Sequence, residues 1–174
     1  MVKVRLYLVR HGKTMFNTIG RAQGWSDTPL TTEGERGIQE LGIGLRESGL
    51  QFDRAYSSDS GRTIQTMGII LEELGFQGKI PYRMDKRIRE WCFGSFDGAY
   101  DGDLFMGIIP RIFNVDHVHQ LSYAELAEGL VEVDTAGWAE GWKNSVAESK
   151  KALKLLLKKW KNKAGGTLSS STME

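Results

Sequence analysis

VRLYLVRHG, residues 4–12, begins with a mainly apolar run and ends in three residues typical of a loop. Its first six residues, Val4 to Val9, include the β-branched and aromatic side chains that are enriched in strands. The run then stops abruptly at Arg10-His11-Gly12. We therefore predict a strand over residues 4–9, central in its sheet, with a loop at its carboxyl end that carries these three residues.

The next seventy residues alternate between helical and strand-like patterns. Thr31 precedes a stretch in which Ile38, Leu41 and Leu45 share one helical face, and Gly49 follows it. This pattern predicts a helix with an N-cap and a stop signal. Further elements are expected as strands over 52–57 and 79–83 and a helix over 61–74. Strand–helix alternation favours an α/β fold: a three-layer α/β/α sandwich around a mainly parallel sheet.

The remainder of the chain completes a single domain over residues 1–174. Residues 99–137 look irregular, with short helices near 104–113 and 123–130, and a long insertion of this kind often covers a site. An apolar stripe predicts one amphipathic helix over 138–163. The small, polar residues 164–174 are expected to be disordered.

Composition narrows the class of protein. Of 174 residues, 40% are hydrophobic and 26% charged, which is ordinary for a globular chain. The single cysteine, Cys92, rules out an internal disulfide and fits a reducing compartment. No apolar run approaches the roughly 20 residues that a membrane span needs. We expect a cytoplasmic protein with no membrane partner.

Charge is distributed unevenly along the chain. Residues 141–174 hold eight lysines against Glu148 and Glu174, a net charge of +6, whereas the whole chain carries +1. The segment has no arginine, and its only aromatic residues are Trp142 and Trp160. We interpret the lysines as the solvated face of a helix rather than as a nucleic-acid surface.

Arg10, His11 and Gly12 form a plausible phosphate site. Ligands in α/β folds bind beyond the carboxyl ends of the strands, where His11 is expected. A neutral imidazole is a competent nucleophile toward phosphorus, and an arginine offers a planar pair of donors to phosphate oxygens. Gly12 would let the main chain approach a ligand closely. By itself, such a tripeptide is equally compatible with a structural histidine.

Four motifs in order strengthen the interpretation. They are LVRHGKTMFN (8–17), GWSDTPLT (24–31), YSSDSGRTIQT (56–66) and REWCFGSFDG (89–98). In these residues the sequence resembles the histidine phosphatase superfamily, in its phosphoglycerate mutase-like branch. The resemblance covers residues 3–98 and implies a soluble enzyme that acts on a small phosphorylated metabolite, without a metal or other cofactor.

The resemblance also implies roles for five residues. His11 would be the nucleophile that becomes phosphorylated, and Glu90 the acid that protonates the leaving oxygen. Arg10, Asn17 and Arg62 would bind the phosphoryl oxygens. A proton on Glu90 near neutral pH requires a partly desolvated carboxyl group, for which the adjacent Trp91 and Phe93 are candidates.

Simpler interpretations remain open for several positions. Arg62 could pair with Asp59, Asn17 could be a turn residue and Glu90 a surface acid. Trp25 and Asp27 are interpreted as packing and turn residues. His117 and His119 share a strand-like spacing, but Asp116 is their only acidic neighbour, and we expect no metal site there.

The C-terminal part departs from the family pattern. Members place a second histidine, in a strand ending Ser-His-Gly, after a long helix, whereas no histidine follows His119 here. We expect an incomplete fold with an unpaired sheet edge. The arginine-free lysine run suggests a shifted reading frame, so that the gene read in another frame would encode Ser-His-Gly.

The retained residues favour a phosphatase over a mutase. Phe93 stands where mutases have a tyrosine, and Arg111 is the only arginine or lysine between Arg89 and Lys143. Such a pocket suits a less charged substrate, and Phe93, Phe96, Tyr100 and Phe105 favour the same conclusion. We therefore expect hydrolysis of a small phosphate monoester through a phosphohistidine. A phosphoglycerate mutase-type isomerase and a silent phosphate-binding fragment are the alternatives.

Overall fold

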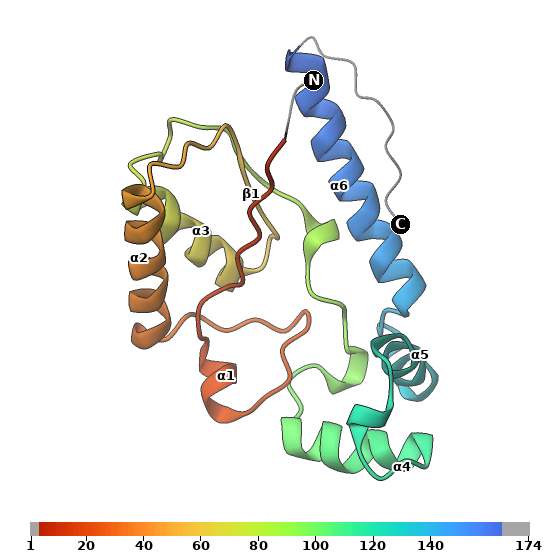
Figure 1. Ribbon diagram of the computed structural model, residues 1–174. Coiled ribbons are helices and arrows are strands. Elements are labelled where there is room, and N and C mark those ends of the chain that lie inside the picture. The colour runs from red at the N-terminus through yellow and green to blue at the C-terminus, as the bar shows by residue number, and fades with distance from the viewer. Residues whose placement is uncertain (1–3, 165–174) are drawn as a thin grey trace.

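The computed structural model describes residues 4–164 (Figure 1). The tail predicted to be disordered, residues 164–174, lies outside them except for Ala164. Residues 4–164 contain two strands, β1 (Ala55–Ser57) and β2 (Tyr82–Met84). The α-helices are α1 (Met15–Ile19), α2 (Thr32–Glu47), α3 (Gly61–Glu73), α4 (Ile109–Phe113), α5 (Tyr123–Val133) and α6 (Trp142–Ala164). Short helical turns are η1 (Lys86–Ile88), η2 (Gly94–Phe96), η3 (Gly102–Ile108, a π-helix) and η4 (Val118–Gln120).

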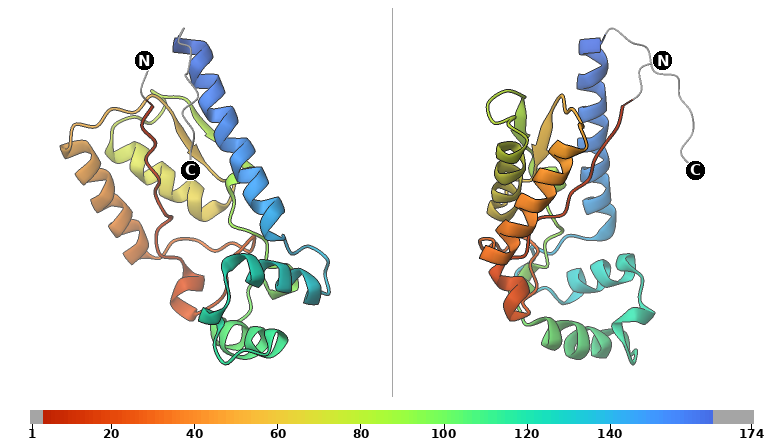
Figure 2. Two further views of the ribbon diagram at one scale, coloured as in Figure 1. Left: turned by 45° about the vertical axis from the view of Figure 1, so that its right-hand side comes forward. Right: turned by 60° about the vertical axis from the view of Figure 1, so that its left-hand side comes forward.

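The predicted α/β class is confirmed. β1 and β2 pair in parallel, with Ala55 opposite Tyr82, and α3 forms the crossover between them. The views in Figures 1 and 2 place β1 between α3 on one side and α6 on the other. α3 therefore covers one face of the sheet, as expected for the helix that connects two parallel strands, and α6 lies on the other side.

α2 and α3 pack tightly because the residues that face each other are apolar or are glycine. The hydroxyl of Thr31 accepts a hydrogen bond from Gly34 N and caps α2, as predicted. Ile38 of α2 is buried against Ile70 and Leu74 of α3. A Cβ atom on Gly42 would lie 2.6 Å from the Cβ of Glu73, so this glycine inside the helix permits the close approach.

The strand predicted over residues 4–9 is not formed. Residues 4–10 are extended, their side chains are exposed, and Leu8 is 87% accessible. Their main-chain groups make no hydrogen bond to another main-chain group within residues 4–164. A cavity of about 500 Å³ separates residues 5–9 from residues 54–58. A β-strand forms only when a neighbouring strand pairs with its main-chain N–H and C=O groups, so the sequence pattern of residues 4–9 is not sufficient by itself to form one.

The second half of the chain builds a separate apolar cluster. Helices near 104–113 and 123–130 were predicted and are present as η3, α4 and α5. Leu104, Ile109 and Leu130 form the centre of this cluster. α6 begins at Trp142, four residues later than predicted, because Asp134 collects the N–H groups of Trp138 and Ala139 in a turn. Within residues 4–164, no helix has the length and apolar character of a membrane span.

Candidate functional site

His11 lies where the extended N-terminal segment meets the start of α3. Its Nδ1 is 2.8 Å from the carbonyl oxygen of Gly12, and only a protonated Nδ1 can donate to that acceptor. In the neutral ring, Nε2 then keeps its lone pair. Gly12 is fixed in turn, since its N–H donates to the hydroxyl of Thr66. A Cβ on Gly12 would lie 2.9 Å from both Gly34 O and an Ile38 side-chain carbon, so this position requires glycine.

The surroundings of His11 favour its neutral form. Burial is the main cause that lowers the pKa of His11 from its ordinary value. The hydrogen bond to Gly12 and the charge of Glu90 act in the opposite direction, while the charges of Arg62 and Arg10 lower the pKa further. The three residues are therefore near enough to His11 for their charges to act on it. At neutral pH the ring is therefore unprotonated.

Arg62 is the most buried charged side chain of this region, with 2% of its surface accessible. Its Nη1 donates to Ser26 O at 2.9 Å and to the Asp27 carboxylate at 3.1 Å, and its Nη2 donates to Gly24 O at 2.8 Å. The pairing with Asp59 that we considered is wrong, because Asp59 binds Arg89 instead. The Nε–H of Arg62 has no partner among the described residues. A buried donor without a partner is rare and costs free energy.

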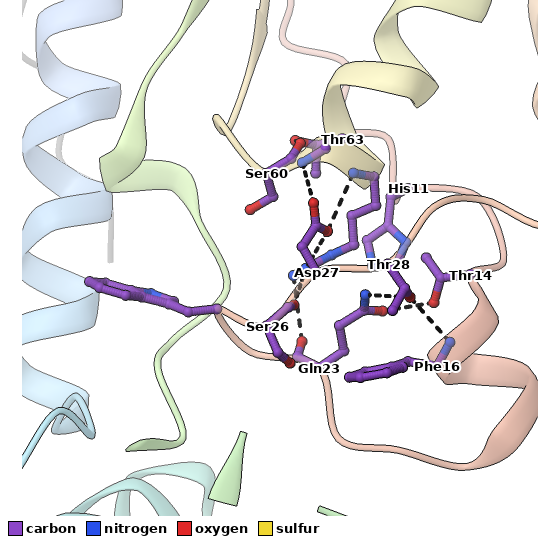
Figure 3. Close-up of polar contacts among 12 residues, drawn as sticks. His11, Thr14, Phe16, Gln23, Ser26, Asp27, Thr28, Ser60 and Thr63 are labelled. Carbon is purple, nitrogen blue, oxygen red and sulfur yellow. Dashed lines mark hydrogen bonds and ion pairs between the residues drawn. The ribbon is translucent and has the colours of Figure 1, made fainter. Parts of the chain in front are cut away.

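Asp27 holds Arg62 and the start of α3, contacts that the sequence did not predict. Its carboxylate accepts the main-chain N–H groups of Gly61 and Arg62 as well as the Arg62 guanidinium. It therefore caps α3, where the Ser60 side chain makes no capping hydrogen bond, and it places a negative charge at a helix N-terminus. Figure 3 shows His11 and Asp27 at this same end of α3. A separation of 34 or 35 residues gave no sequence signal for these contacts.

Arg10 and Asn17 lie in the same loop but have different surroundings. Arg10 is exposed and carries its charge beside His11. Asn17 forms a capping box at α1: its Oδ1 accepts from Thr14 N, and its own N–H donates to Thr14 Oγ1. The turn role that we considered for Asn17 is thus present. Its oxygen is committed to the cap, which leaves its amide NH₂ as the group able to donate to a ligand.

Glu90 follows η1 and is exposed, so the partly desolvated setting that we expected for it is wrong. Its Oε1 accepts the N–H of Trp91 at 3.1 Å. Glu90 also lines a cavity of about 600 Å³ whose other walls come from the segment after it, from η3, from the start of α5 and from α6. The aromatic neighbours Trp91 and Phe93 contact each other edge to face, with ring centres 5.8 Å apart. They form the wall of this cavity rather than a cover over the carboxylate.

Asp97 joins the segment that carries Glu90 to the loop that holds Arg62. Its carboxylate accepts the N–H groups of Gly24, Trp25, Ser26 and Phe93. The carbonyl groups of this same loop accept the donors of Arg62. Asp97 was quoted within a motif but given no role, because its partners in the loop lie more than 70 residues away in sequence. It is a positioning residue for the site.

No group of three or more His, Cys, Asp or Glu side chains suited to a metal ion occurs in the part of the chain that the structure describes. His117 and His119 lie at η4, exposed, in the second half of the chain. The charges of Arg10, Arg62 and Glu90 all act on the imidazole of His11.

Known proteins share both the sequence and the fold. A 2,3-bisphosphoglycerate-dependent phosphoglycerate mutase of Treponema pallidum (strain Nichols) is 44% identical over 55 residues, which are 32% of this chain and 22% of that protein. The crystal structure of a phosphoglycerate mutase from Bacillus anthracis str. Sterne superposes with a TM-score of 0.80 at 31% identity, covering 90% of this chain and 68% of that one.

An alpha-ribazole phosphatase from Shigella flexneri shares the fold, with a TM-score of 0.63 at 19% identity, over 87% of this chain and 66% of that chain. The chain aligns with only 22% of the length of the curated mutase. The family description "Histidine phosphatase superfamily (branch 1)" matches residues 6–104, which are more than half of the chain and contain all four motifs. On this match, the chain belongs to the histidine phosphatase superfamily, branch 1.

Proposed function

We propose that this chain hydrolyses a small phosphate monoester through a phosphohistidine on His11. In the first step Nε2 of His11 forms a bond to phosphorus, the bond from phosphorus to the ester oxygen breaks, and Glu90 gives a proton to the departing alcohol. Since Glu90 is exposed in the free protein, the substrate would have to supply the desolvation that keeps this proton on the carboxyl group, by filling the cavity beside it. In the second step a water molecule attacks the phosphohistidine, its proton passes to Glu90, and phosphate leaves. The neutral, Nδ1-protonated ring of His11 is the single observation that carries this proposal.

Charge stabilisation in this scheme comes from Arg62 and Arg10. Arg62 would act on the transferring group through its positive charge, since Asp27 and the loop carbonyls hold its Nη donors and its Nε is buried. A charge fixed before the substrate arrives needs no reorganisation during the reaction. Arg10 and the amide of Asn17 would bind the remaining oxygens from the exposed side. Phosphoryl transfer asks a protein mainly for such positioning.

Hydrolysis is favoured over isomerisation because the cavity beside Glu90 offers little to hold a second anionic group. Of the two basic residues that line it, Arg89 is bound to Asp59 through two nitrogens and lies over the Trp25 ring. Lys150 is a single exposed ammonium group. Arg111, on α4, does not line this cavity. A mutase would need a clamp for the substrate carboxylate, and a lone lysine is a poor one.

The test is turnover of p-nitrophenyl phosphate by the wild type, His11→Ala and the matched control His117→Ala. We expect turnover that is lost in His11→Ala and kept in His117→Ala, whose imidazole is exposed and far from the motifs in sequence. Equal background rates in all three proteins would leave the silent phosphate-binding fragment as the correct description. Conversion of 3-phosphoglycerate to 2-phosphoglycerate without release of phosphate would establish the mutase instead.

A further inference from the structure

The cavity beside Glu90 is walled by aromatic side chains that converge from three parts of the chain. Trp91 contacts Phe93, Tyr123 and Trp142 edge to face, with ring centres 5.8, 6.3 and 6.0 Å apart. Tyr123 begins α5 and Trp142 begins α6, so two helix starts bring their rings to a wall that begins with Trp91 of the fourth motif. We call Trp91, Tyr123 and Trp142 the aromatic wall.

The aromatic wall is open rather than filled by the protein. Tyr123 is 73% accessible and Trp142 is 37% accessible, although both belong to residue types that normally bury their rings. Phe105, Val146 and Leu153 extend the same apolar lining around a cavity of about 600 Å³. This volume lies in the range of small-molecule sites, which combine apolar walls with a few polar groups. Exposed rings gathered around one cavity indicate a ligand surface.

The position of Glu90 decides which part of a substrate would enter. Glu90 lines this cavity, whereas His11 lines the other cavity, beside residues 5–9 and 54–58. The two cavities adjoin, since Ser149 and Leu153 line both. In an in-line transfer, the nucleophile and the leaving oxygen lie on opposite sides of phosphorus. The group attached to the oxygen that Glu90 protonates therefore extends past Glu90, toward the aromatic wall. That group is the alcohol part of the monoester.

We infer that the cavity selects monoesters of alcohols that carry an aromatic ring, with the aromatic wall as the specificity-determining surface. This inference rests on the proposed function for the orientation of the substrate. Ring–ring contacts with Trp91, Tyr123 and Trp142 would stabilise an aromatic group beyond the burial of its area. A glycerate or sugar alcohol would instead place hydroxyl or carboxylate groups against ring faces that offer them no hydrogen bond.

The test compares 2-phenylethyl phosphate with n-propyl phosphate. Both are esters of primary alkyl alcohols, so their leaving groups are similar and the ring is the main difference. For the wild type we expect kcat/KM to be about 30-fold higher for 2-phenylethyl phosphate, as expected for burial of one phenyl group. In Trp142→Ala and in Tyr123→Ala this ratio should fall at least about five-fold. Trp138→Ala is the matched control, since Trp138 is as exposed as Tyr123 but does not line the cavity.

A binding measurement separates this inference from the proposed reaction. Isothermal titration with the non-hydrolysable 2-phenylethylphosphonate and propylphosphonate should give the same preference and the same loss in Trp142→Ala, even if no turnover occurs. A preference for the phenyl ligand in binding without turnover would support the aromatic wall and reject the reaction. Turnover with a ratio near one, or a ratio that Trp138→Ala lowers as much as Trp142→Ala, would overturn the inference about the aromatic wall.

Discussion

The contact between Asp27 and Arg62 gives the sharpest prediction about stability. In Asp27→Asn the negative charge is removed while the guanidinium stays buried, with 2% of its surface accessible. The amide would also direct an NH₂ group toward the N–H donors of Gly61 and Arg62, which the carboxylate accepts in the wild type. Breaking a fully buried ion pair costs about 3–5 kcal/mol.

Two features of the structure reduce this value. The Asp27 side chain is 32% accessible, so water screens part of the interaction. Arg62 also keeps its bonds to Ser26 O and Gly24 O. We therefore expect a loss of about 2 kcal/mol in the free energy of unfolding. With a urea m-value of about 2 kcal/mol/M, the unfolding midpoint should fall by about 1 M.

Asp59→Asn provides the matched control. The same substitution there breaks the pair between Asp59 and Arg89, whose side chains are 36% and 27% accessible, and an exposed pair contributes about 1 kcal/mol or less. Urea unfolding followed by tryptophan fluorescence measures both variants against the wild type. Equal midpoint shifts in the two variants would refute the argument that Asp27 neutralises a buried charge.

Three further predictions concern single groups. In an NMR titration, His11 should show a pKa below the ordinary value of 6.5, because burial and, to a smaller extent, the charges of Arg62 and Arg10 lower it. The unfolded chain then binds more protons than the folded one, so the free energy of unfolding should fall as pH drops below 6.5. A His11 pKa at or above 6.5 would contradict this prediction. Burial raises the pKa of the Cys92 thiol to about 11. At about pH 8 the folded protein should therefore react with Ellman's reagent far more slowly than the urea-unfolded chain, whereas equal rates would show that the thiol is accessible. In a hydrogen-exchange experiment, the amide hydrogens of residues 5–9 should exchange at the earliest time points, because they make no main-chain hydrogen bond within the described part of the chain. The amide hydrogen of Ile70, inside α3, should be protected. Protection of residues 5–9 as well would indicate that this segment pairs with a strand in solution.

Local patterns predicted the helices of this chain well. The apolar spacing of Ile38 and Leu45 indicated the face of α2 that packs against α3, and the residues that set this pattern lie within one element. Capping by Thr31 is equally local. The segment over residues 4–9 has the composition of a strand, but a strand depends on hydrogen bonds to distant segments. Composition does not report whether such a partner is present.

For the candidate site as well, the sequence predicted some of the residues but not the long-range contacts that hold them. The four motifs identified His11 and Arg62, and the structure brings both, with the charges of Arg10 and Glu90, into one region. The motifs could not indicate that Arg62 is held by Asp27, or that Asp97 ties the loop of Gly24 to Phe93. The contacts of Arg62 with Asp27 and of Asp97 with Gly24 join positions 35 and 73 residues apart, and each donor has several plausible acceptors in the sequence. Only the folded chain selects among them.

The proposed reaction depends on the ability of one nitrogen, Nε2 of His11, to carry a phosphoryl group. The direct measurement is to mix the protein with p-nitrophenyl phosphate, quench the reaction in alkali within milliseconds to seconds, and map the modification by mass spectrometry of peptides. We predict one phosphoryl group on His11, stable in alkali and labile in acid, and none in His11→Ala. A phosphoryl group on a serine or on another histidine, or release of p-nitrophenol by a protein that never becomes phosphorylated, would contradict the central claim.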